Sequence, residues 1–380
     1  MKLEKKKMWK TGCLAAAGVL FLLFVYLLNQ VEKTELLETE GRNFENAVVM
    51  EVIKDNVTES GNIVGDQTVL LRLESGGHAG EEVEAISSSG YLFGAHCTQG
   101  MKVIALVSES QGELVATVYS VRRAPMMYLM VVLFILAILL IGGKKGFASV
   151  AGLAFTILCV IFVFFPLIYR GASPIWTAVF VVIVTTVVTM FLIDGVTCKS
   201  AAAILGTIIG VCVAGVFAWV FGKVTHLTGY SVSDVENLVY VEQNTDIQVG
   251  ELLFAGILIA ALGAVMDVSM SIASTICEIH QKNPALTTRE LFHSGMNVGK
   301  DMMGTMSNTL ILAFTGGSMN TLVFLYAYNY QYRQVANMAS IGIEVMQGVS
   351  ASMGVIMAVP FVSLISAWMW RRKEKRNNEA

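Results

Sequence analysis

Charged residues are scarce in this chain of 380 residues, and their scarcity restricts its class. Only 14% of the residues are charged, whereas about 25% is usual for a soluble globular protein. The mean hydropathy of +0.64 points the same way. This composition argues against a soluble protein and indicates an integral membrane protein, for which we expect no nucleic-acid partner.

The short motifs of common enzymes are also missing. The sequence has no phosphate-binding Gly-rich loop ending in Lys-Ser/Thr, no HExxH and no GxSxG. His78 and the adjacent pair His96 and Cys97 match no zinc-ligand spacing. We therefore expect no metal and no cofactor, and the sequence argues against an enzyme. An intramembrane hydrolase built on Asp267 and Asp301 stays open as an alternative, because two carboxylates near one membrane face can pair.

Long apolar stretches are what the sequence has instead. About 20 apolar residues span the hydrocarbon core of a bilayer as a helix. Eight stretches of roughly this length occur, at residues 12–28, 126–141, 147–169, 175–193, 201–222, 251–277, 305–328 and 346–370. No small-x-small cleavage site follows the first stretch, which therefore predicts an uncleaved anchor rather than a signal peptide. The expected fold class is an α-helical polytopic membrane bundle of about eight transmembrane helices.

Basic residues orient these helices. If the N-terminus is cytoplasmic, the inner segments hold 16 Lys and Arg residues, and the short outer loops hold 3, leaving residues 30–124 aside. The positive-inside rule requires this asymmetry. We therefore predict both termini in the cytoplasm, in the cell membrane of a bacterium. The predicted order is an anchor helix (1–29), an extracytoplasmic β domain (30–124), a seven-helix membrane domain (125–370) and a basic cytoplasmic tail (371–380).

Residues 30–124 differ in composition and predict the small outer domain. The segment holds 15 acidic and 7 basic residues. Five short β-type runs lie between Gly and Ser clusters, at 48–53, 68–73, 82–86, 101–107 and 113–119. Such runs are typical of a barrel or sandwich, and five strands suffice for an OB-like barrel. Its single cysteine, Cys97, excludes an internal disulfide. A Glu-rich stretch at 31–46 is interpreted as a helical stalk.

Polar residues within the stretch 251–277 are candidate functional positions. Asp267 follows Glu251 by sixteen residues, which is about 24 Å along a helix axis. This places it in the inner part of a hydrocarbon core about 30 Å thick. Ser271 continues a polar stripe toward the inner end, which predicts a polar vestibule or, alternatively, a helix end facing water. Small residues that recur every four positions in the preceding stretch predict close packing: Ala202, Gly206, Gly210, Ala214 and Ala218.

The segment after Pro284 carries the remaining candidates. Thr287 and Glu290 have capping-box spacing, which predicts that a helix starts there. Over 288–303 the pattern is amphipathic and predicts a helix at the inner interface. The polar residues and helix breaks that follow are Asp301, Asn308, Thr309, Gly316, Gly317, Glu344 and Pro360. A Gly-interrupted helix is where transporters often expose backbone to a substrate, although glycines can also mark simple flexibility.

These positions lead to one hypothesis about a site. We expect Asp267, Asp301 and Asn308 to converge near the cytoplasmic mouth of a cavity bounded by the helices 251–277, 305–328 and 346–370. The glycine break and Pro360 would let the walls of this cavity bend or expose backbone carbonyls.

Two long motifs resemble a known family. They are residues 256–274 (GILIAALGAVMDVSMSIAS) and 294–314 (SGMNVGKDMMGTMSNTLILAF), accompanied by residues 142–146, 205–207 and 354–360. The chain is similar here to the YibE/F family, and the resemblance extends over nearly the whole chain, including the outer domain. It implies a multi-spanning bacterial membrane protein. It implies no catalytic residue, because the family has no assigned activity.

Two functions follow from the sequence. A permease or ion-coupled transporter, acting on an unknown small solute or ion, is favoured by the interrupted helix and the polar stripe. A membrane scaffold or assembly partner is the alternative, because a simple carrier would not need the outer domain. The lipid bilayer is the expected partner in both cases. A protein partner or a homo-oligomer is compatible with either.

Overall fold

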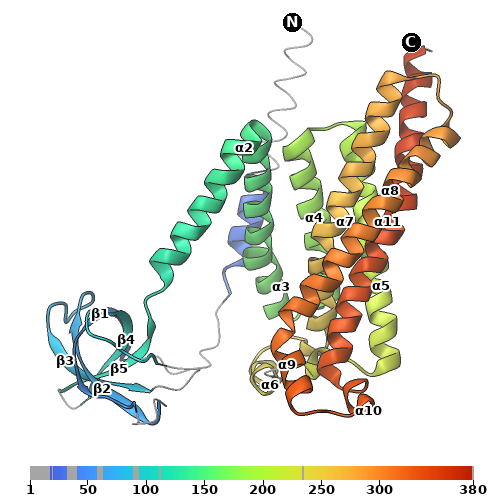
Figure 1. Cartoon of the computed structure of the whole chain (residues 1–380). Helices are drawn as coiled ribbons and strands as arrows, with labels where there is room; N and C mark the ends of the chain where they lie inside the picture. Colours follow the sequence, from blue (N-terminus) through green and yellow to red (C-terminus); the bar gives the residue numbers. More distant parts are fainter. Residues whose placement is uncertain are drawn as a thin grey trace, which may run out of the picture. The chain divides into compact units, whose positions relative to one another are not determined.

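The computed structural model describes residues 18, 20–31, 41–57, 63–88, 94–110, 113–232 and 235–378. Two compact units divide the chain. We call residues 35–140 the barrel unit, and residues 1–34 with 141–380 the helical unit. Figure 1 shows the strands of the first and the helices of the second.

Five strands close a barrel in the order β1-β2-β3-β5-β4, and β4 pairs with β1. The β3–β5 pair is parallel, and the other pairs are antiparallel. The strands are β1 (Arg42–Lys54), β2 (Asp66–Leu73), β3 (Glu82–Ser88), β4 (Lys102–Ser110) and β5 (Glu113–Val121). Each of the five predicted runs overlaps one strand, so the prediction of a small five-stranded barrel is confirmed. The predicted stalk is wrong over 42–46, which belongs to β1; residues 32–40 lie outside the described part.

Alternation of apolar side chains builds the core of the barrel. Along β2, Val69, Leu71 and Leu73 are buried while the residues between them are more exposed, as a period of two requires. Gln67 closes one side of this core, because its amide donates to the carbonyl of Cys97 (3.0 Å) and accepts from the Cys97 amide (2.7 Å). Burial raises the pKa of the Cys97 thiol, so Cys97 behaves as a packing residue.

The rest of the described chain is mostly helical. Five helices are long and apolar enough to cross a membrane, or six if the bent pair α8 and α9 forms one crossing. The chain is therefore a membrane protein. The helices are α2 (Ala124–Cys159), η1 (Val160–Phe164), α3 (Phe165–Tyr169), α4 (Pro174–Asp194), α5 (Cys198–Thr225), η2 (Gly229–Ser231), α6 (Val235–Asn244), α7 (Val249–Lys282), α8 (Thr288–Gly317), α9 (Met319–Ala327), α10 (Tyr332–Val335) and α11 (Ala339–Asn378).

Gly143 interrupts α2. Its φ of 51° and ψ of −128° are not helical, so two helical segments meet there. This φ lies in the left-handed region, which glycine adopts without steric cost. The predicted stretches 126–141 and 147–169 lie on either side of Gly143, and together they form the single apolar candidate Ala124–Tyr169.

Small residues let α5, α7 and α11 approach closely. A Cβ added at Gly210 of α5 would lie 2.6 Å from Val265 of α7 and 2.9 Å from both Ala358 and the Gly354 carbonyl of α11. The predicted small-residue face of α5 is buried throughout: Ala202, Gly206, Gly210, Ala214 and Ala218. Close backbone approach thus holds the centre of this bundle together.

Residues 288–303 are helical, as the sequence predicts. The predicted helix forms the first half of α8, which begins with the predicted capping box of Thr287 and Glu290, and its position at the inner interface stays a prediction. Gly295 and Gly299, one turn apart, are buried against α7 and α11. Two glycines at this spacing permit close helix packing, so α8 enters the bundle from its first turns and runs beside α11 (Figure 1).

Candidate functional site

The register of α7 and α8 places the predicted site residues along the bundle. A Cβ added at Gly295 would meet Ile276 at 2.6 Å, and one added at Gly299 would meet Ile272 at 3.2 Å. The two helices therefore run antiparallel: a residue four positions later on α8 contacts a residue four positions earlier on α7. Continued by five residues, this register brings Gly304 level with Asp267.

Asp267 is exposed on the surface of the helical unit. Its carboxylate has no hydrogen bond or ion pair with any residue that the structure describes. The contacts of Gly210 with Val265 place Asp267 level with about Ile208 of α5. Ile208 lies ten residues after the first residue of α5, Cys198, or about 15 Å along the axis. Asp267 is thus well inside the bundle's length, at a depth where an unpartnered carboxylate is costly in lipid.

The same level of α8 carries a second polar surface. Asp301 and Asn308 are exposed, one turn to either side of Gly304, and their side chains have no partner among the described residues. A Cβ added at Gly304 would have open space around it. Thr309 is exposed too, but its hydroxyl donates to the carbonyl of Thr305 at 2.9 Å. Asp301 and Asn308 therefore lie about one turn to either side of the level of Asp267 on a neighbouring helix, whereas the enclosing cavity stays a prediction.

Two serines that the sequence did not single out lie between α8 and α11. The contacts of Gly299 with Val359 and of Gly348 with Ile311 fix the register of these helices. That register places Ser307 within about one residue of the level of Ser352. Both hydroxyls are buried and have no hydrogen-bond partner among the described residues. The sequence signals were the spacing of Gly348 and Ser352, which is equally typical of packing, and the hydroxyl-rich tract 304–309 that contains Ser307.

A cavity of about 270 Å³ lies further along α8, where the helix breaks. The axes of α8 and α9 meet at 63°, and Ser318 lies between them, directly after Gly316 and Gly317. Six apolar residues form most of the wall: Ile311, Phe314, Leu322, Ile341, Val345 and Val349. Thr315, Ser318 and Glu344 supply its polar side chains. The predicted helix break at Gly316 and Gly317 is confirmed. Glu344 of α11 lines the cavity beside this break.

The predicted residues thus fall into two groups along α8. Asp267, Ser271, Asp301, Asn308 and Thr309 belong to the first group. The glycine break and Glu344 belong to the second, since the cavity begins at Ile311 and is centred near Thr315. Gly304 and Thr315 are separated by eleven residues, or about 16 Å of helix.

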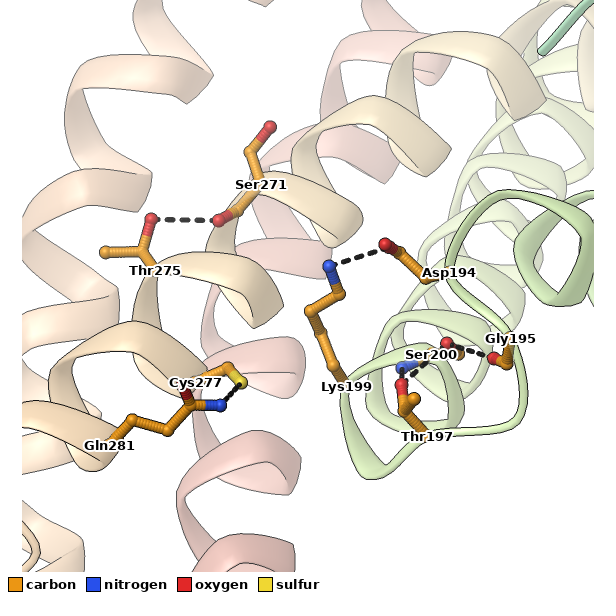
Figure 2. A network of polar contacts seen from close by, with 9 residues as sticks. All are labelled: Asp194, Gly195, Thr197, Lys199, Ser200, Ser271, Thr275, Cys277 and Gln281. Atoms are coloured by element: carbon orange, nitrogen blue, oxygen red, sulfur yellow. Dashed lines mark hydrogen bonds and ion pairs between the residues drawn. The ribbon is translucent and has the colours of Figure 1, made fainter. Parts of the chain in front are cut away.

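An ion pair that the sequence did not predict closes the turn between α4 and α5. Lys199 Nζ lies 2.7 Å from Asp194 Oδ2, and both side chains are largely buried. Thr197 caps α5 by accepting from the Ser200 amide at 3.1 Å. Figure 2 shows this turn together with part of α7. There the Thr275 hydroxyl donates to the backbone carbonyl of Ser271 at 2.9 Å, and the figure shows no contact of the Ser271 hydroxyl. In the sequence, the one sign of this ion pair is that Asp194 and Lys199 have opposite charges and lie five positions apart, on either side of Gly195.

Comparison with known protein families identifies the family of the helical region. The sequence model described as YibE/F-like protein matches residues 130–372. The matched region runs from within α2 to within α11 and contains all the motifs named above, whereas the barrel, to which the resemblance was expected to extend, lies outside it. No curated protein and no solved structure matches the chain.

Proposed function

The chain belongs to the YibE/F-like family, and from that premise we propose that it is a permease or ion-coupled transporter. Asp267 is the observation that carries the proposal. An unpartnered carboxylate about 15 Å from the end of its neighbouring helix is unfavourable in lipid, and intramembrane carboxylates usually mark the path of an ion or proton. Its exposure on the helical unit leaves it accessible to such a cargo.

The polar groups of α8 supply the rest of a path. Asp301 and Asn308 offer a carboxylate and an amide about one turn to either side of the level of Asp267, and the break at Gly316 and Gly317 adjoins the cavity that Glu344 lines. A solute or ion would move along α8 between these two groups. The buried hydroxyls of Ser307 and Ser352 would serve as further ligands if α8 and α11 separate.

We place this path in a chain with eight crossings and both termini in the cytoplasm. The non-helical Gly143 supports two crossings within α2 and α3, and the bent α8 and α9 support one more. The barrel, with its five strands in the order β1-β2-β3-β5-β4, would be OB-like and extracytoplasmic. The cell membrane of a bacterium is the location that the charge asymmetry favours.

A scaffold function is the second candidate, and the surface of the barrel favours it. A hollow of about 540 Å³ is lined by Phe44, Tyr119 and Ile104 and extends to Met127 at the start of α2. The rings of Phe44 and Tyr119 pack edge to face at 5.0 Å, and both are exposed. Exposed aromatic residues beside a hollow are typical of protein-binding surfaces. A protein partner would bind there.

Substitution of Asp267 tests the transport proposal. In a deletion strain that expresses each variant, we expect Asp267→Asn to reproduce the solute and ion profile of the deletion, because it removes the charge while keeping the shape. Asp267→Glu should retain part of the activity. Glu278→Gln is the matched control, since Glu278 is exposed on the same helix three turns further on. A wild-type profile for Asp267→Asn at normal membrane abundance would reject the permease.

A further inference from the structure

The cavity beside the α8–α9 break presents acceptors and no basic group. Thr315 Oγ1 donates its hydrogen to the Ile311 carbonyl at 2.7 Å, and Ser318 Oγ donates to the Phe314 carbonyl at 3.2 Å. Their oxygen lone pairs are therefore what these hydroxyls can offer to a ligand. Glu344 adds a carboxylate that has no partner among the described residues. No Lys, Arg or His occurs among the described residues that line the cavity.

The position of the cavity adds to its negative character. It lies at the last turn of α8, where Thr315 precedes the C-terminal residue Gly317 by two positions. The carbonyls of a C-terminal turn can accept hydrogen bonds from a cation. Together with Glu344 they select for a positively charged group that can also donate hydrogen bonds.

The walls favour an organic ligand over a metal ion. Calcium sites supply six to eight oxygen ligands, whereas among the described residues that line this cavity Thr315, Ser318 and Glu344 bring polar side chains and the others are apolar or glycine. An apolar wall instead favours a ligand with a hydrocarbon body. The volume of about 270 Å³ is near the lower end for ligand pockets, so the ligand is small, or only one end of it enters.

We propose that this cavity binds a primary ammonium group carried on an apolar body. The ammonium would donate to Glu344, Thr315 and Ser318, and the hydrocarbon would contact Ile311, Phe314 and Val349. Both a free alkylamine and the ethanolamine head of a lipid have this chemistry. The inference deepens the proposed function by naming the substrate class at the outer part of the path, and it rests on that function only for the ligand's onward movement.

Binding of n-hexylammonium to the full chain in phosphatidylcholine nanodiscs tests the site, measured by calorimetry. We expect saturable binding to the wild type, and an affinity at least about tenfold lower for Glu344→Gln, because a hydrogen-bonded charge is lost. Glu236→Gln is the matched control, since Glu236 is exposed on α6 and does not line the cavity. The uncharged 1-hexanol should bind the wild type and Glu344→Gln alike.

Other outcomes decide the remaining questions. Equal affinity for the wild type and Glu344→Gln, or no saturable binding to the wild type, would overturn the site. Added phosphatidylethanolamine that competes with hexylammonium assigns the site to the lipid head, and lack of competition assigns it to a free amine; either result retains the ammonium site. Binding at Glu344 is measured without any transport, so this experiment tests the inference separately from the transport function.

Discussion

At the scale of single residues, Gly210 is the position where the smallest change should matter most. A Cβ there would lie 2.6 Å from Val265 and 2.9 Å from the Gly354 carbonyl, closer than real contacts allow. We expect Gly210→Ala to destabilise the bundle by about 1–3 kcal/mol through overpacking. Gly256→Ala is the control, because its Cβ would meet nothing within 4 Å; it should be neutral or stabilising by up to about 1 kcal/mol. Unfolding in mixed detergents measures both, and equal shifts would contradict this packing.

Which residues face one another is the part of the site that the sequence could not provide. Asp267, Asp301 and Asn308 were found because polar groups in apolar stretches are conspicuous. Ser307 and Ser352 were not, because a serine in such a stretch can bond to its own helix and only the rotation of α8 against α11 buries these hydroxyls. Likewise, Lys199 was counted only as an inner charge, since nothing in the sequence shows that the turn at Gly195 aims it at Asp194.

At the scale of elements, the bend between α8 and α9 depends on sequence rather than on crowding. Neither Gly316 nor Gly317 has a neighbour within 4 Å of an added Cβ, and neither has a positive φ. Alanine at both sites should favour a continuous helix, because each glycine costs about 0.5–1 kcal/mol in a helix interior. We expect Gly316→Ala/Gly317→Ala to lengthen the distance between spin labels at Thr305 and Tyr326, measured by pulsed electron resonance in a background without native cysteines.

The control for this measurement lies in the same helix. Gly304→Ala adds an equally unhindered methyl group away from the bend and should leave the distance unchanged. The same double variant should weaken hexylammonium binding, because a straighter helix would move Ser318 away from Glu344. An unchanged label distance in the double variant would show that the surrounding helices, rather than the glycines, impose the bend.

Element boundaries followed local sequence signals where such signals exist. The capping box of Thr287 and Glu290 marks the start of α8, and Gly316 and Gly317 mark its end. Both ends of this helix were therefore predictable from the sequence. The path of α8 between them was not, because an amphipathic pattern fits an interfacial helix and a bundle helix equally well. The contacts of Gly295 and Gly299 place this half of α8 against α7 and α11, and no local sequence signal specifies these contacts.

At the scale of the whole molecule, the arrangement of the helical unit bears on its orientation in the membrane. The end of α11 lies at the opposite end of the bundle from α6, α9 and α10 (Figure 1). The end of α11 carries Arg371 and Arg372 at the head of the basic tail, whereas α6 at the other end carries the acidic residues Glu236 and Glu242. Under the positive-inside rule the tail belongs in the cytoplasm.

Reporter fusions to the full membrane domain test this orientation. We expect green fluorescent protein fused after Arg376 to fluoresce, because it folds in the cytoplasm. Alkaline phosphatase fused after Asn244, at the end of α6, should be active, because that segment would be exported. Replacing the five basic residues of the tail by Gln should lower the fraction of correctly oriented chains without inverting it, since Lys144, Lys145 and the other inner residues still retain the bias. An active phosphatase after Arg376 would require an odd number of crossings after a cytoplasmic N-terminus, and the eight-helix topology would then be wrong.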